Sequence, residues 1–199
     1  LNLLYDRQRK QYQIARQNVQ IINRKCHELK VQIADLRRLQ PDEATTQSLD
    51  EAEQAARMYD ANAATGNEVL DVVLTEKSLL CEAQRIRLNC VADGTCLAAI
   101  EPGDLYALFS NLLDQAIDAA AQQQNDRRMI DLLVCRRQGF AVINVIGPAL
   151  SGSQSDHGRR HSYELKVARR VVQKYSGTMA TEPRGELFAV KIVMPLTRG

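Results

Sequence analysis

Three oxygen-bearing side chains recur along one stretch of the chain at the spacing of a helix. Asn111, Gln115 and Asp118 are separated by steps of four and three residues, so on a helix they share one polar face. Amide and carboxylate oxygens of this kind are hard ligands that suit a Mg²⁺ ion and the phosphate groups bound to it. The alternative is an ordinary amphipathic helix with its polar residues in water, and periodicity alone favours that interpretation.

A helix that would carry these residues is predicted by the apolar side chains around them. These side chains recur at helical spacing: Leu105, Leu108, Phe109, Leu112, Ala116 and Ala119. Pro102-Gly103-Asp104 opens the segment, and we expect Asp104 to be the N-cap. The segment should therefore bury one side in a core and present the polar face to a cavity or to solvent.

A second candidate for chemistry lies on a long helix near the start of the chain. Apolar residues step by three and four, as in a heptad seam: Tyr12, Ala15, Val19, Ile22, Cys26, Leu29, Ile33 and Leu36. His27 follows a seam residue directly, so we expect it to be partly exposed, with an imidazole that is largely neutral and nucleophilic near neutral pH. Glu28 could accept its ring proton or orient it. A surface histidine without a role is the simpler alternative.

The long helix should end near Arg38, because Pro41 follows. A second seam predicts a second helix: Leu49, Ala52, Ala56, Tyr59 and Ala63. Two seamed helices with a short connection indicate an antiparallel hairpin, and two such hairpins would close a four-helix bundle, so we predict a homodimer. The hairpin would occupy residues 1–64, and Thr65-Gly66-Asn67 would end it.

The remainder, residues 65–199, predicts an α+β fold. Helices are expected at 68–84, 102–120 and 161–175, and strands at 85–91, 127–137, 140–146, 178–181 and 187–195. Gln138-Gly139 should form a hairpin turn, and 147–160 should be a mobile loop or lid. A two-layer sandwich with helices on one face of a mixed sheet is the arrangement that buries these elements.

The bulk composition excludes several classes of protein. The 199 residues carry a net charge of +2, so neither nucleic acid nor a membrane surface is implied as a partner. Apolar runs are too short for a membrane helix, and a secretory signal is not visible. Five cysteines without a CxxC pair argue against zinc or a disulfide framework, and indicate a reducing, cytoplasmic location. Because Leu1 already lies in a helical pattern, we expect a fragment of a longer chain, with any sensor or membrane segment before it.

Several phrases of the sequence resemble the GHKL ATPase and histidine kinase family. NLLDQAIDA, starting at Asn111, is similar to the family's N-box, NLLDNAIEA. NRKCHELK, which contains His27, resembles the phosphoacceptor box of quorum-sensing-type kinases, and GNEVLDVVLTEK resembles the segment that follows it. HSYELKVARRVVQKYSG and ELFAVKIVMP look like the family's last helix and last strand. The resemblance covers nearly the whole chain and implies the Bergerat ATP-binding fold.

The resemblance also implies roles and partners. His27 would be the phosphoacceptor with Glu28 as its acidic neighbour, ATP would be the cofactor, and a response regulator would receive the phosphoryl group. Asn111 and Gln115 would hold Mg²⁺ through ATP. The residues implied at the nucleotide site are Asn111, Asp114, Gln115, Asp118, Gly147, His161, Ser162 and Leu165. The chain would be the soluble, cytoplasmic catalytic part of a sensor histidine kinase, and a membrane would be reached only through a missing N-terminal sensor segment.

The sequence departs from the family pattern at the nucleotide site. Gln115 and Gly147 replace asparagines, and Ser162 and Glu164 replace two glycines. A carboxylate near a triphosphate adds repulsion, and the longer amide displaces a metal ligand. These changes favour weakened or lost ATP binding, and the alternative function is a degenerate pseudokinase scaffold. A counter-interpretation places the phosphates against Gly158, Arg159 and Arg160. A metabolic ATPase is disfavoured by the long helix that carries the histidine.

Overall fold

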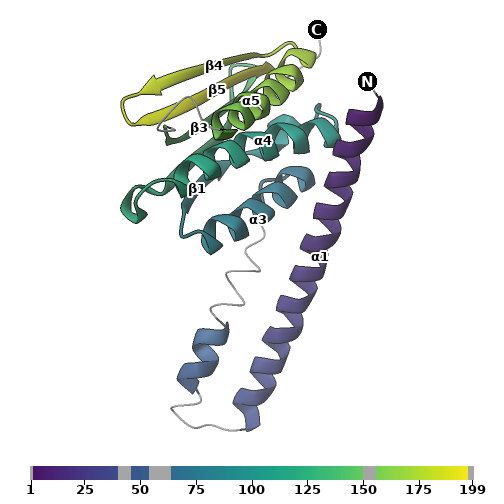
Figure 1. Ribbon diagram of the computed structural model, residues 1–199. Coiled ribbons are helices and arrows are strands. Elements are labelled where there is room, and N and C mark those ends of the chain that lie inside the picture. Colours follow the sequence, from purple (N-terminus) through teal and green to yellow (C-terminus); the bar gives the residue numbers. More distant parts are fainter. Residues whose placement is uncertain (1, 40–45, 54–63, 150–155, 197–199) are drawn as a thin grey trace.

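A long helix stands beside a two-layer α/β sandwich in the structure, a computed structural model that describes residues 2–39, 46–53, 64–149 and 156–196 (Figure 1). The elements are α1 (Asn2–Leu39), a short helix at 46–53, α3 (Glu68–Ala83), β1 (Arg87–Ala92), α4 (Pro102–Ala121), β2 (Met129–Arg137), β3 (Phe140–Pro148), α5 (Asp156–Lys174), β4 (Thr178–Arg184) and β5 (Leu187–Pro195), with short 3₁₀ turns at Gly94–Leu97 and Asn125–Arg127. Within these residues, every helix is too short or too polar to cross a membrane.

The sheet has five strands in the order β1-β2-β3-β5-β4. β1 pairs with β2 in parallel, and the other neighbours are antiparallel. The centre of the sheet is fully buried where Val134 pairs with Ile143 and Ile143 pairs with Ile192. Because α3, α4 and α5 cover one face, the predicted two-layer α/β sandwich is confirmed.

Helix α4 is the centre of the core. Its predicted apolar stripe is buried throughout, and Phe109 and Leu112 have no exposed surface. The predicted N-cap is wrong, because the capping position is Glu101 and Asp104 lies in the first turn. Asp104 instead accepts hydrogen bonds from Lys174 Nζ at 2.6 Å and from Tyr175 Oη at 2.7 Å, which tie the start of α4 to the end of α5.

The seam of α1 divides into two parts. Tyr12, Ala15 and Val19 belong to the same buried cluster as the side chains of α3 and α4. Further along, Cys26 and Ile33 are buried, and Arg37 forms ion pairs with Asp50 and Glu53 of the second helix. Leu29 and Leu36 stay about half exposed, at 49% and 52%. The predicted seam residues Ala56, Tyr59 and Ala63 lie outside the described residues, and the division at residue 64 stays a prediction.

The segment 147–160, predicted as a mobile loop or lid, overlaps a strand and a helix at its two ends, and its middle, residues 150–155, lies outside the described residues, so a lid there stays a prediction. Strand β3 extends to Pro148, and α5 begins at Asp156 rather than at His161. Strand β4 likewise runs on to Arg184 through Pro183. The proline is tolerated because β4 is an edge strand, where a missing N–H breaks no ladder hydrogen bond.

Helix α5 ends on a residue in the left-handed region. Ser176 has φ +56°, and Gly177 N–H donates to Val172 O at 2.9 Å, as in a Schellman motif. Since a Cβ is unfavourable in this conformation, Ser176→Gly should raise the free energy of unfolding by about 1 kcal/mol. Urea denaturation measures the change. The matched variant Ser78→Gly, within α3, should lower it by about 0.5–1 kcal/mol, and equal signs for the two would contradict the cap.

Candidate functional site

A cavity of about 660 Å³ lies between the first half of α1 and the helices of the sandwich. Its volume falls in the range of small-molecule sites. The polar residues that line it come from three helices: Arg7, Gln8, Gln11 and Asn18 from α1, Glu76 and Lys77 from α3, and Tyr106, Ser110, Asn111 and Asp114 from α4. Two of the residues predicted at a nucleotide site, Asn111 and Asp114, are therefore brought together here.

Asn111 has its amide orientation fixed by its own helix. Its Nδ2 donates to Ala107 O at 2.6 Å, and its side chain is half buried on the wall of the cavity. Because the donor group is engaged, the amide oxygen is left as an acceptor. An amide oxygen is a hard ligand, as a Mg²⁺ ion requires.

Asp114 lies in a buried charged group with two residues of α3. Lys77 Nζ lies 2.8 Å from Asp114 Oδ1 and 3.4 Å from Glu76 Oε1, and the Lys77 side chain is only 6% exposed. Ser110 Oγ donates to the other Asp114 oxygen at 3.4 Å. Burial lowers the pKa of Lys77, but the Asp114 and Glu76 charges raise it by more, so the pKa lies above its usual value.

The sequence interpretation missed Lys77. The sequence feature that could have identified it is a charged residue at a helix position where apolar residues are expected. The buried face of α3 includes Leu70, Val73, Leu74 and Cys81. A lysine on such a face needs an acceptor from another element, and Asp114 of α4 is that acceptor.

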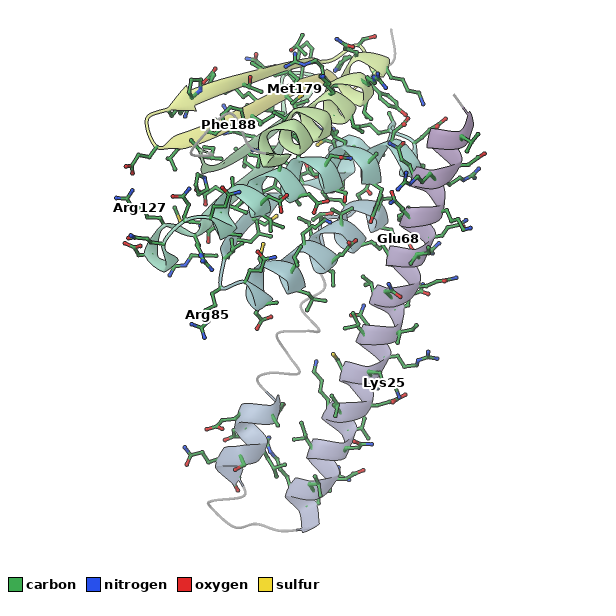
Figure 2. All side chains as sticks on the ribbon, in the orientation of Figure 1. Lys25, Glu68, Arg85, Arg127, Met179 and Phe188 are labelled. Carbon is green, nitrogen blue, oxygen red and sulfur yellow. The ribbon has the colours of Figure 1, made fainter. Side chains whose placement is uncertain are left out.

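The outer wall of the cavity is anchored to the sandwich by aromatic and charged contacts. The rings of Tyr12 and Tyr106 lie 5.8 Å apart between centroids, at an interplanar angle of 52°. Tyr106 Oη donates to Glu76 Oε2 at 3.1 Å, and Arg16 Nη2 lies 2.6 Å from Glu68 Oε1. Figure 2 shows Glu68 beside α1. Burial, and then the charge of Glu76, raise the pKa of Tyr106.

His27 is exposed, as predicted, on the part of α1 that extends beyond the sandwich. Figure 2 labels Lys25 on this part of the helix. Lys25 Nζ lies 2.7 Å from Glu28 Oε2, and this contact lowers the pKa of Glu28. The α1 residues that line the cavity end at Ile22. His27 lies about 7–8 Å further along the helix axis, so the imidazole is outside the cavity.

The other predicted site residues lie outside the wall of this cavity, as far as the described residues define it. Gln115 is 4% exposed, and Asp118 is half buried. Gly147 is buried in β3, and Leu165 packs partly against the core. His161 and Ser162 belong to α5, but their side chains are outside the described part of the structure. Roles for these residues in nucleotide binding, and for Glu28 beside His27, stay predictions.

Comparison with known proteins finds a family model and solved structures that are similar to part of this chain. Residues 100–195 match a family model described as a GHKL domain. Two nucleotide-free structures of the catalytic domain of histidine kinase ThkA are similar at 15% identity, with TM-scores of 0.51 and 0.50. Each similarity covers 66% of this chain and 92% of the other. A search of curated proteins found no match. The chain therefore carries a GHKL domain at residues 100–195, and its fold is that of histidine kinase catalytic domains.

Proposed function

We propose that the chain is the catalytic part of a two-component sensor histidine kinase. It binds Mg²⁺–ATP beside Asn111, transfers the γ-phosphoryl group to His27, and passes that group to a response regulator. One observation carries the proposal: the helix that forms the outer wall of the cavity beside Asn111 and Asp114 is also the helix that bears His27. The GHKL domain and its fold support the same assignment.

The described side chains fit a magnesium nucleotide. Mg²⁺ in such sites is held by one or two protein oxygens together with the phosphates, and Asn111 and Asp114 supply an amide and a carboxylate oxygen. When bound, the ion would neutralise charge on the phosphates during transfer. The γ-phosphorus bond to the bridging oxygen breaks, a P–N bond forms at a ring nitrogen of His27, and ADP leaves.

The position of His27 constrains how the phosphoryl group can reach it. Because the imidazole lies beyond the cavity, transfer requires either a movement of α1 against the sandwich or a cavity supplied by a second copy. A second copy is favoured by the half-exposed seam residues Leu29 and Leu36, which a partner hairpin would bury in a four-helix bundle. We therefore include the homodimer in the proposal.

The alternative function is a scaffold with weak or no ATP binding. One observation favours it: Gln115, the second predicted amide ligand, is 4% exposed and lies outside the lining of the described cavity. Only one of the two predicted metal ligands therefore faces the space that a nucleotide would occupy.

Asn111→Ala should weaken the binding of a non-hydrolysable Mg²⁺–ATP analogue by about 10- to 100-fold, because it removes an oxygen ligand. Isothermal titration calorimetry measures the dissociation constants. Asn89→Ala, on the exposed edge strand β1, should leave affinity unchanged. Equal affinities of wild type and Asn111→Ala would remove Asn111 from the site. Failure of the wild type to bind at millimolar nucleotide would favour the scaffold.

A further inference from the structure

Lys77 is a buried cation on the wall of the cavity. Its side chain is 6% exposed, and it shares the cavity lining with Ser110 and Asn111. Moving an ammonium group out of water is unfavourable unless nearby charges compensate for the lost hydration. The chain therefore places a positive charge beside Asn111 at a position where an apolar side chain would be less costly.

The contacts of Lys77 leave capacity for a further acceptor. An ammonium has three N–H donors, and Asp114 and Glu76 engage two of them. These carboxylates are its partners within the described part of the chain, so one donor is left for an acceptor in the cavity. The raised pKa keeps the group charged at neutral pH.

A purely structural role would not require the charge. Apart from Thr75, whose hydroxyl donates to Asp71 O of its own helix, the rest of the buried face of α3 is apolar. Well-packed apolar residues that replace a whole buried ion pair commonly match or exceed it in stability. An apolar contact could therefore hold α3 and α4 together without a lysine. The lysine charge, which already pairs with Asp114 and Glu76, has a further use if a negative group of a ligand enters the cavity. Arg7, from the opposite wall, adds a second positive group to the same space.

We propose that Lys77 binds the terminal phosphate of the nucleotide and lets the site distinguish a triphosphate from a diphosphate. This inference rests on the proposed function. A cation from α3 thereby does the work for which the family pattern uses the glycines that Ser162 and Glu164 replace. The phosphate is recognised through a charge-assisted hydrogen bond, not through backbone donors.

The test compares the affinities of a non-hydrolysable Mg²⁺–ATP analogue and of Mg²⁺–ADP for three proteins. The wild type and Lys77→Arg, which retains the charge, should prefer the triphosphate by about tenfold. Lys77→Met should lose about tenfold in triphosphate affinity and bind the two ligands nearly equally. The control Lys191→Met, at an exposed residue of β5, should behave as wild type. Thermal unfolding without nucleotide should show Lys77→Met less stable than the wild type, because Asp114 loses its cation. Binding is therefore measured at a temperature at which all the proteins are folded, which separates binding from folding.

Two results would overturn the inference in different ways. If Lys77→Met keeps the triphosphate preference while Asn111→Ala still weakens binding, Lys77 is only a structural residue and the proposed function stands. If the wild type binds neither nucleotide, the proposed function and the role of Lys77 fail together.

Discussion

Replacing His27 with alanine should abolish the transfer of the γ-phosphoryl group from ATP to the chain. An imidazole nitrogen is the nucleophile in the proposed reaction, and loss of a nucleophile commonly lowers such a step by far more than a hundredfold. His27 is exposed, so the substitution should leave the fold intact. Incubation with radiolabelled ATP measures the transfer, and label on the wild type should be released by acid, as expected for a phosphoramidate.

The chain provides its own control for this experiment, since it contains only three histidines. His157→Ala should label as the wild type does, which distinguishes the loss of the predicted acceptor from the loss of another histidine in the chain. Label of equal strength on the wild type and on His27→Ala would remove His27 from the scheme. Mixing His27→Ala with Asn111→Ala should restore label only if one subunit phosphorylates the other.

Gly177→Ala should destabilise the domain by about 3 kcal/mol. A Cβ built at this position would lie 2.5 Å from Met194 Cγ, 2.9 Å from Val172 Cγ1 and 2.9 Å from Val193 O. The side chain of Met194 could move, but the backbone oxygen belongs to β5 and is held by the sheet. Overpacking of this kind costs about 1–3 kcal/mol, and the loss of a close helix–sheet approach adds to it. Urea denaturation measures the difference.

A glycine with free space around it is the matched control. Gly103 lies in the first turn of α4, and a Cβ there meets nothing within 4 Å. Gly103→Ala should therefore be neutral or stabilising by up to about 1 kcal/mol, because alanine favours the helix. Equal destabilisation by both substitutions would show that the close approach at Gly177 does not control stability.

Local patterns predicted the elements whose surroundings are simple. Every apolar residue of the α4 stripe is buried, so the spacing of these residues in the sequence was enough to predict the helix. The hairpin between β2 and β3 could also be predicted from the sequence, because Gln138-Gly139 suits a tight turn. Both residues adopt positive φ, at +46° and +82°, as such a turn requires. In both cases the residues that decide the structure are neighbours in the sequence.

Contacts between distant residues explain what the sequence did not predict. Asp104 resembled a local cap, but its hydrogen-bond partners, Lys174 and Tyr175, lie 70 and 71 residues away. The buried charge of Lys77 is explained by its ion pair with Asp114, which lies on another helix, so the residues around Lys77 in the sequence could not predict its role. The heptad seam likewise predicts that α1 packs against a partner. It does not predict that the first half of α1 packs on α3 and α4 while its second half packs on the next helix.

The continuity of α1 has a mechanical consequence. Tyr12, whose ring contacts that of Tyr106 on the sandwich, and His27 are carried by one uninterrupted helix from Asn2 to Leu39. A helix behaves as a stiff rod over this length, so an axial rotation that draws the tyrosine away also turns the imidazole by nearly the same angle. A torque on α1 would therefore open the cavity and reorient His27 in the same movement, without a separate element to couple the two changes.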